Sequence, residues 1–275
     1  MEIMNKENWT KWEPEPIPSF PLYSFEKIDT DYWYRFAEEN PLLHVQIVLI
    51  YLIALYILRN FYMKDRKPLE IRPILFVWNL SMGLFSLFAC FRMSRELILV
   101  LSWDQGFYKS ICVREGLHMS SMFWGILYVW SKVFFLADTV FLVLLKKRIH
   151  PFHIFHHTLA TIIPPQIMPL GEPIVRWFAT VNYFVHAIVY PILALQAAKV
   201  KIPKVGLITM ILELLQMVFA LGISFYTVLV KHNGGDCVRH PWSLQLCNYM
   251  YIGFLLFVIH LCYQKFTVGG KQKAV

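Results

Sequence analysis

The chain has 275 residues, of which 57% are hydrophobic and only 16% are charged, and its formal net charge is +8. An average soluble domain carries about 25% charge, and a water-soluble domain of this length could not hide so much apolar surface. The composition therefore argues against a soluble enzyme, a disordered chain and a low-complexity protein. It indicates an all-α polytopic membrane protein, whose positive charge marks topology or an anionic ligand rather than nucleic acid.

The first 40 residues are polar, proline-rich and acidic, and they lack the basic start and short apolar core of a signal peptide. We expect residues 1–40 to form a tail on one side of the membrane. Asn8 begins the sequon Asn8-Trp9-Thr10, which predicts glycosylation of Asn8 on the luminal side.

Seven apolar runs follow, at residues 42–61, 73–91, 117–145, 157–168, 174–196, 206–230 and 244–263. Most have the length of about 20 residues that a bilayer-spanning helix needs. The fourth run is the shortest and is interrupted by Pro164 and Pro165. We find no repeat and no linker, so residues 41–265 are predicted to form one domain of seven transmembrane helices.

Charge sets the predicted orientation of these helices. The loops after the first, third and fifth runs and the C-terminal tail, counted together with Arg59 at the end of the first run and Lys265 just after the last, hold fourteen basic residues and two acidic ones. The loops on the other side are close to neutral, and the first 40 residues are net acidic. The positive-inside rule then places the N-terminus in the lumen and the C-terminus in the cytosol. The dilysine pattern of Lys271 and Lys273 agrees, because it is typical of a retrieval signal for the endoplasmic reticulum.

Two of the five cysteines, Cys112 and Cys237, fall in different luminal loops, where the compartment is oxidising. We expect a disulfide between them, the alternative being two free thiols.

The stretch from His150 to His157 holds four of the ten histidines next to the basic run Lys146, Lys147 and Arg148. In a helix, His153, His156 and His157 share one face. Imidazole can bind a metal, act as a general acid or base, or act as a nucleophile. A di-iron site would need further histidine boxes, and the scattered remaining histidines do not form them, so we expect no metal. A zinc site on the three histidines would lack a nearby carboxylate or thiolate.

Polar residues also occur inside other apolar runs, where they should face the interior of the bundle. Asn182, His186 and Tyr190 share one face of the fifth run. Lys132 and Asp138 lie in the third run, and Glu213 and Gln216 lie in the sixth. Interhelical hydrogen bonding is the alternative to a functional role for these residues.

Together these residues resemble a known family, the very-long-chain fatty-acid elongases of the ELO family. The resemblance rests on the ordered set of Lys132 with Asp138-Thr139, the HxxHH box at 153–157, the Asn182-x-x-x-His186-x-x-x-Tyr190 stretch and Gln216, and it covers roughly residues 40 to 265. The chain departs from the family pattern at Phe135, where the family has Glu, at Phe155, where Tyr is frequent, and at Glu213, where Gln is usual.

The resemblance implies an acyltransferase, a 3-oxoacyl-CoA synthase of the endoplasmic-reticulum membrane. It would join a long-chain acyl-CoA to malonyl-CoA, giving 3-oxoacyl-CoA, carbon dioxide and CoA, without a cofactor. It also implies six helices around a closed acyl tunnel, with the first helix peripheral. The residues around Asn182 and Gln216 resemble most the branch of the family that acts on saturated and monounsaturated chains.

The resemblance also suggests roles for the residues. His156 would accept the acyl group, His186 would complete the acyl-enzyme site, and His153 and His157 would orient groups or move protons. The substrate-binding set comprises Lys132, Asp138, Asn182, Tyr190 and Gln216. The predicted CoA-phosphate set comprises Lys146, Lys147, Arg148, Lys199, Lys201 and Lys204, for which membrane topology alone is the alternative explanation.

The expected partners are the lipid bilayer, the two CoA thioesters, and the reductases and dehydratase that complete an elongation cycle. Three other functions compete with this interpretation. The first is a catalytically silent elongase relative that binds lipid or partner subunits, which Phe135 suggests. The second is a di-iron membrane desaturase or hydroxylase, and the third is a seven-helix receptor.

Overall fold

The structure is a computed structural model that describes residues 21–114 and 118–271, with the side chains described as far as residue 260. Every regular element within these residues is a helix. The elements are η1 (Ser24–Glu26), α2 (Thr30–Glu39), α3 (Leu43–Ile57), η2 (Leu58–Tyr62), α4 (Arg72–Leu101), α5 (Gly106–Cys112), α6 (Met119–Phe135), α7 (Ala137–Leu144), α8 (Pro151–Ile167), η3 (Met168–Leu170), α9 (Val175–Ala197), α10 (Val205–His232) and α11 (Pro241–Lys271).

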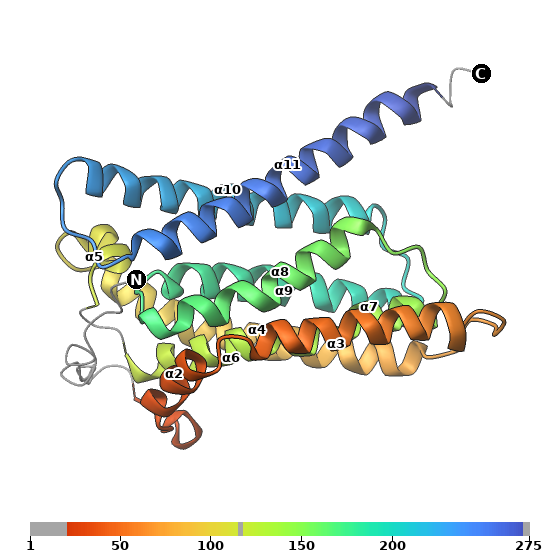
Figure 1. Ribbon diagram of the computed structural model, residues 1–275, viewed down its shortest axis with the longest axis horizontal. Helices are drawn as coiled ribbons and strands as arrows, with labels where there is room; N and C mark the ends of the chain where they lie inside the picture. The colour runs from red at the N-terminus through yellow and green to blue at the C-terminus, as the bar shows by residue number, and fades with distance from the viewer. Residues whose placement is uncertain (1–20, 115–117, 272–275) are drawn as a thin grey trace.

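The long helices run side by side as an elongated bundle with two distinct ends (Figure 1). One end, here called the disulfide end, gathers η1, α2, α5, η3 and the α10–α11 connection. The opposite end, here called the basic end, gathers the connections at residues 63–71, 145–150 and 198–204. The last turns of α11 extend beyond the rest of the bundle (Figure 1).

Six helical segments of the described chain are long and apolar enough to cross a membrane. They are Leu43–Tyr62, Arg72–Leu101, Met119–Leu144, Val175–Ala197, Val205–His232 and Pro241–His260. The polytopic membrane class is therefore confirmed.

The fourth predicted span corresponds to α8, which also runs from the basic end towards the disulfide end, where it meets η3 and α2. Its 17 residues extend about 25 Å, and its histidines make it less apolar than the six segments. A count of seven membrane-spanning helices thus stays a prediction.

Residues 21–40 are more ordered than a simple tail, because η1 and α2 pack on the disulfide end of the bundle. The Glu26 side chain is fully buried and forms an ion pair with Arg92 of α4. It also accepts hydrogen bonds from Ser120 Oγ at 2.8 Å and Trp124 Nε1 at 2.7 Å. This carboxylate therefore ties the segment before α2 to α4 and α6. The Asn8 sequon lies outside the described residues.

Two more buried ion pairs join helices at the same end. Arg176 of α9 donates to Glu96 of α4 at 2.7 Å. Arg239 donates to Glu172 at 3.2 Å, and Glu172 also accepts from the backbone of His240 at 2.7 Å. The predicted disulfide between Cys112 and Cys237 is confirmed, and it links α5 to the α10–α11 connection. The described ion pairs and the disulfide all lie at this end.

The third predicted span is divided at Leu136, where α6 ends and α7 begins. Around this joint, the amide of Leu136 donates to the carbonyl of Val133, and the amide of Thr139 donates to the carbonyl of Leu136. Lys132, before the joint, and Asp138, after it, both face the interior of the bundle.

Helices α4 and α9 pack closely along their lengths. A Cβ atom on Gly83 would lie 2.8 Å from the Pro191 ring, so glycine is required where these helices approach. Pro191 removes one backbone donor inside α9 and so interrupts its hydrogen-bond ladder.

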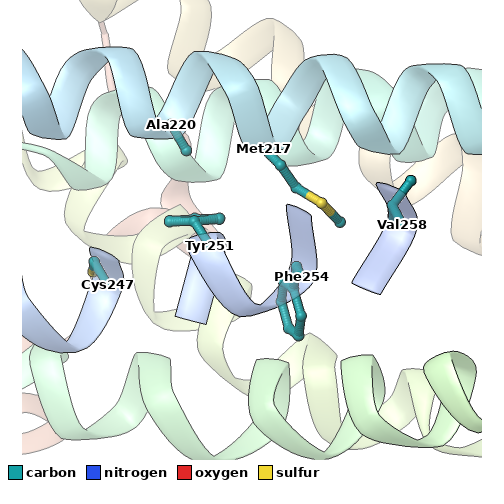
Figure 2. Close-up of a cluster of buried hydrophobic side chains, with 6 residues drawn as sticks. All are labelled: Met217, Ala220, Cys247, Tyr251, Phe254 and Val258. Carbon is teal, nitrogen blue, oxygen red and sulfur yellow. The ribbon is translucent and has the colours of Figure 1, made fainter. Parts of the chain in front are cut away.

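The core between α10 and α11 contains Met217, Ala220, Cys247, Tyr251, Phe254 and Val258 (Figure 2). The Phe254 ring is directed away from α10 and packs on Phe152 and His156 of α8. On the outer surface, Ile50 and Ile53 of α3 and Val77 and Leu84 of α4 are exposed. Exposed apolar side chains on these helices are expected of a surface that faces lipid.

Candidate active site

A cavity of about 1780 Å³ lies inside the bundle, between the basic end and the middle of the molecule. Helices α4, α6, α7, α8, α9, α10 and α11 all contribute to its wall. At its inner end lie Tyr128, Met217, Met250 and Tyr251, two of which belong to the core cluster in Figure 2. All nine predicted catalytic and substrate-binding residues line it: Lys132, Asp138, His153, His156, His157, Asn182, His186, Tyr190 and Gln216.

The three histidines of the HxxHH box reach this cavity because α8 begins just before them. The His150 side chain caps the helix by accepting from the amide of Phe152 at 3.3 Å, and Pro151 occupies the first turn. The His153 and His157 rings lie 4.3 Å apart, and the His156 and His157 rings lie 5.8 Å apart, as centroid distances. The helical spacing therefore gathers the three imidazoles as predicted.

His156 and His186 share a further property. The Nδ1 atom of each ring is buried and has no hydrogen-bond partner within the described residues. The His156 ring packs against Phe254 at 4.9 Å, and the His186 ring packs against Phe135 at 4.7 Å. Buried polar atoms in native proteins nearly always have partners, so these two nitrogens on a cavity wall are candidates for contact with a ligand.

Asn182 connects the polar residues of three helices. Its Oδ1 accepts a hydrogen bond from Lys132 Nζ of α6. Its Nδ2 lies 3.4 Å from His186 Nε2 and 3.4 Å from Gln216 Oε1 of α10. An ammonium group can only donate, so Lys132 fixes the orientation of the amide, and Nδ2 faces His186.

Both oxygens of Asp138 are occupied by protein groups. Oδ1 accepts from Trp78 Nε1 of α4 at 2.8 Å, and Oδ2 accepts from the Tyr190 hydroxyl of α9 at 2.6 Å. The Tyr190 ring in turn packs on Phe135 at 5.3 Å and against His186 at 5.3 Å. Asp138 therefore holds α4, α7 and α9 together around the cavity, and Trp78 joins the set of site residues.

Phe135 gives Lys132 an aromatic neighbour where the resemblance suggests a carboxylate. The ammonium group lies 4.2 Å from the centroid of Tyr128 and 5.3 Å from that of Phe135. Such cation–π contacts are each worth about 0.5 to 2 kcal/mol, more when desolvated. Among the described residues, Lys132 forms no ion pair, so its charge faces the cavity with only an amide oxygen and two ring faces around it.

The opening of the cavity at the basic end is rich in cations. Of the predicted CoA-phosphate residues, Lys147, Lys199 and Lys201 line it, whereas Lys146, Arg148 and Lys204 do not. Lys146 instead donates to the carbonyl of Lys64 at 3.0 Å. Lys67, in the connection before α4, and Arg72, the first residue of α4, also line the opening and were not among the predicted CoA-phosphate residues. Their position among the basic residues that directly precede an apolar run was the available signal.

Thr139 is a further residue that the pattern alone left without a role. It is fully buried, and its Oγ1 lies 3.0 Å from His153 Nε2. Its place directly after Asp138 in the motif was the signal for it.

No group of three or more His, Cys, Asp and Glu side chains in the described part of the chain is arranged to hold a metal ion. The histidine set presents nitrogen atoms to an internal cavity, and a cluster of cations surrounds the opening of that cavity. The molecule is thus a polytopic helical membrane protein with a histidine-lined internal site that opens among positive charges.

Comparisons with known proteins agree with this class. The chain matches the model of the ELO (GNS1/SUR4) family over residues 36–274. "Very long chain fatty acid elongase 3" of Homo sapiens is 32% identical over 246 residues, which cover 87% of this chain and 89% of that protein. "Very long chain fatty acid elongase 6" of Drosophila melanogaster is 28% identical over 265 residues, which cover 90% and 84%. "Very long chain fatty acid elongase 4" of Trypanosoma cruzi is 33% identical over 225 residues, which cover 77% and 78%.

The chain belongs to the ELO family. This membership confirms the resemblance drawn from the motifs, and it sets aside the receptor and the di-iron desaturase. The branch within the family stays a prediction, because the relatives carry several different elongase names.

Proposed function

We propose that this protein joins a long-chain acyl-CoA to malonyl-CoA, as the condensing enzyme of fatty acid elongation, through an acyl group held on His156. The condensing role rests on the family and on relatives that are named fatty acid elongases. The observation that carries the proposed mechanism is the pair of unpartnered Nδ1 atoms of His156 and His186 on the wall of one cavity.

In the first step, His156 Nδ1 attacks the thioester carbonyl. A carbon–nitrogen bond forms, the carbon–sulfur bond breaks, and CoA leaves as a thiolate that takes the proton released from His156. A neutral imidazole suits this role because it is a nucleophile near neutral pH, and a covalent intermediate divides one hard step into two. Burial among Phe152 and Phe254 favours the neutral form of the ring.

The hydrogen bonds of Asn182 support a different role for His186. Because Nδ2 of Asn182 is a donor facing His186 Nε2, that nitrogen accepts, and the proton of a neutral His186 ring lies on Nδ1. The unpartnered Nδ1–H can then donate to the carbonyl oxygen of the acyl group as negative charge develops on it. Losing one such donor costs about 100- to 1000-fold in rate in enzymes where this has been tested.

In the second step, malonyl-CoA loses carbon dioxide, and the electron pair left behind forms an enolate. The enolate attacks the acyl carbon, a carbon–carbon bond forms, the bond to His156 breaks, and the imidazole of His156 takes up one proton from solvent. Lys132, which has no carboxylate partner among the described residues, is placed to stabilise the malonyl carboxylate and the enolate. His153 and His157 are placed next to His156 for proton movement.

The cations at the opening suit the phosphate groups of CoA. Lys67, Arg72, Lys147, Lys199 and Lys201 lie along the part of the cavity wall nearest the basic end. Positive charge at the mouth of a low-dielectric cavity raises the local concentration of an anionic substrate. The thioester would then enter from the basic end, with its acyl tail deepest in the cavity.

We place the protein in the endoplasmic-reticulum membrane with the basic end towards the cytosol, where CoA thioesters are found, and the disulfide end in the lumen. The positive-inside pattern and the disulfide at the opposite end support this orientation. The bilayer, the two CoA thioesters and the enzymes that reduce and dehydrate the 3-oxo product are the proposed partners. No cofactor enters the proposed steps, and the proposed substrates are saturated and monounsaturated chains.

The test supplies purified protein in liposomes with acyl-CoA and malonyl-CoA labelled in the carbons that are retained. We expect labelled 3-oxoacyl-CoA from the parent protein and none from His156→Ala. A covalent acyl adduct on His156, detected by mass spectrometry after incubation with acyl-CoA alone, would support the first step. Full activity in His156→Ala would refute the assigned nucleophile, and no product from the folded parent protein with any chain length would favour the silent relative.

A further inference from the structure

Glu213 lies on the cavity wall between the histidines and the cations of the opening. It belongs to a stripe on α10 whose members recur at helical spacing and all line the cavity: Gly206, Thr209, Met210, Glu213, Gln216 and Met217. Helix α10 starts at the basic end, and Gln216 Oε1 lies 3.4 Å from Nδ2 of Asn182, the residue that contacts His186. At 1.5 Å per residue, Glu213 is about 4.5 Å nearer the opening than Gln216 along the helix axis.

The Glu213 carboxylate has no protein donor in the part of the chain that the structure describes. It takes part in none of the described hydrogen bonds, and the three described ion pairs use other residues. Asp138, on the wall of the same cavity, accepts from Trp78 and Tyr190 instead. A carboxylate inside an apolar span is costly unless it meets donors. Glu213 on the cavity wall therefore points to a contact with a ligand.

The chemistry of a carboxylate limits which part of a ligand it can contact. An ionised carboxylate only accepts hydrogen bonds, so its partner must be a donor. The acyl and malonyl groups of the proposed substrates offer only oxygen acceptors, and the CoA phosphates are anionic and would be repelled. The pantetheine arm, which connects the phosphates to the sulfur, carries amide N–H groups and a hydroxyl. It is the donor-bearing part of the thioester between the phosphates and the acyl group.

The depth of Glu213 in the cavity selects the amide nearest the sulfur. In the proposed binding mode, the thioester carbon lies at His156 and His186, and the phosphates lie among the cations of the opening. The pantetheine arm then follows the cavity from the histidines to the opening and passes Glu213 on the way. The cysteamine amide is separated from the sulfur by only an ethylene group, so it is the donor within reach at this depth.

We propose that Glu213 is a substrate-binding residue, whose carboxylate accepts a hydrogen bond from the cysteamine amide N–H of the CoA thioester. The inference rests on the proposed function, because that function supplies the ligand and its direction in the cavity. The contact fixes the depth of both substrates, since acyl-CoA and malonyl-CoA carry the same arm. It thereby holds the thioester carbon beside His156 in the first step and the malonyl group beside Lys132 in the second.

The experiment removes the donor from the ligand and the acceptor from the protein, separately and together. The ligands are CoA and an analogue with an ester oxygen in place of the cysteamine amide N–H. For full-length protein in liposomes, we expect the analogue to bind about 10- to 100-fold more weakly than CoA, the range for a hydrogen bond to a charged group. Glu213→Leu should bind CoA more weakly by a similar factor and should no longer distinguish the two ligands, because changes at the two partners of one contact are not additive.

Two further variants serve as controls. Glu70→Leu removes another carboxylate from the wall of the same cavity, at its basic end, and should keep the parent preference for CoA over the analogue. Glu213→Gln separates acceptance of a hydrogen bond from transfer of a proton. Its amide oxygen still accepts, so this variant should keep most of the preference and most of kcat for 3-oxoacyl-CoA formation, whereas loss of a proton-transferring carboxylate would abolish kcat.

Several results would overturn the inference. One is equal binding of CoA and the analogue by the parent protein, which needs no variant to fold. Others are an unchanged preference in Glu213→Leu, an equal loss of preference in Glu70→Leu, and a loss of kcat in Glu213→Gln as large as that in Glu213→Leu.

The binding measurement uses free CoA, so it does not depend on condensation. The expected binding pattern in a protein that makes no 3-oxoacyl-CoA would refute the proposed function and leave the role of Glu213 standing. Product formation without that pattern would refute the role of Glu213 alone, and a parent protein that does not bind CoA would refute both.

Discussion

Replacing Asn182 by Asp tests how the hydrogen bonds around the site control its chemistry. The two side chains have nearly the same shape, but Asp replaces the Nδ2 donor that faces His186 with an acceptor. His186 Nε2 would then carry the proton, and Nδ1 on the cavity wall would change from donor to acceptor. We expect kcat to fall about 100- to 1000-fold, the cost of removing one preorganised donor from a developing oxyanion.

The same substitution should spare the fold, because the new carboxylate lies beside the Lys132 ammonium, which has no ion-pair partner among the described residues. The assay measures labelled 3-oxoacyl-CoA formation by purified protein in liposomes, with thermal melting of the same samples. Asn79→Asp is the control, since it places a carboxylate on the wall of the same cavity, and Asn79 makes no described contact with a histidine. Asn182→Asp with a rate within threefold of the parent would refute the tautomer assignment, as would an equal loss in Asn79→Asp.

Three further predictions concern stability, measured by thermal or denaturant unfolding. Arg176→Met removes the partner of the buried, charged Glu96 and should lower the free energy of unfolding by about 3 to 5 kcal/mol. Adding Glu96→Met should restore part of that free energy, and equal losses in the single and double variants would contradict this. Gly83→Ala should lower the free energy of unfolding by about 1 to 3 kcal/mol, because its Cβ would lie 2.8 Å from the Pro191 ring. Gly222→Ala is the control, since open space surrounds Gly222, and it should not lower that free energy. Equal effects of the two substitutions would show that α4 and α9 can separate freely. Burial raises the pKa of Glu26, but hydrogen bonds from Arg92, the Tyr23 amide, Trp124 and Ser120 outweigh burial and leave the pKa below its ordinary value of 4.5. The ionised carboxylate therefore stabilises the folded protein above pH 4.5, and this contribution is lost as the pH falls below that value. Glu26→Gln should be less stable than the parent at pH 7 and should lose less on acidification; parallel stability curves for the two proteins would contradict this.

The helices and the clustering of the site residues could be predicted from the sequence, because both depend on patterns within a single helix. An apolar run of bilayer length predicts a span, and HxxHH on a helix places three imidazoles on one face. The nine predicted site residues share the cavity wall because an apolar span has few places for a polar side chain except the interior.

The residues that were missed depend on contacts between distant parts of the chain. The second run was expected to end near residue 91, because Arg92, Arg95 and Glu96 follow it. The helix instead continues to Leu101, since Arg92 and Glu96 are neutralised by Glu26 and Arg176. The four-residue spacing of Arg92 and Glu96, followed by more apolar residues, was a local sign of this continuation. Trp78 gave no such sign, because an aromatic residue in an apolar run looks the same whether it faces lipid or a buried carboxylate.

The two ends of the bundle differ in how firmly they are joined. A covalent bond and three buried ion pairs fasten the helices at the disulfide end, while at the basic end like charges on neighbouring connections repel one another. The helices are therefore held together at the disulfide end, whereas charge repulsion favours their separation at the basic end. A polyphosphate ligand would cancel that repulsion and draw the free ends together around itself, and its departure would let them part again for a product whose tail is buried between them.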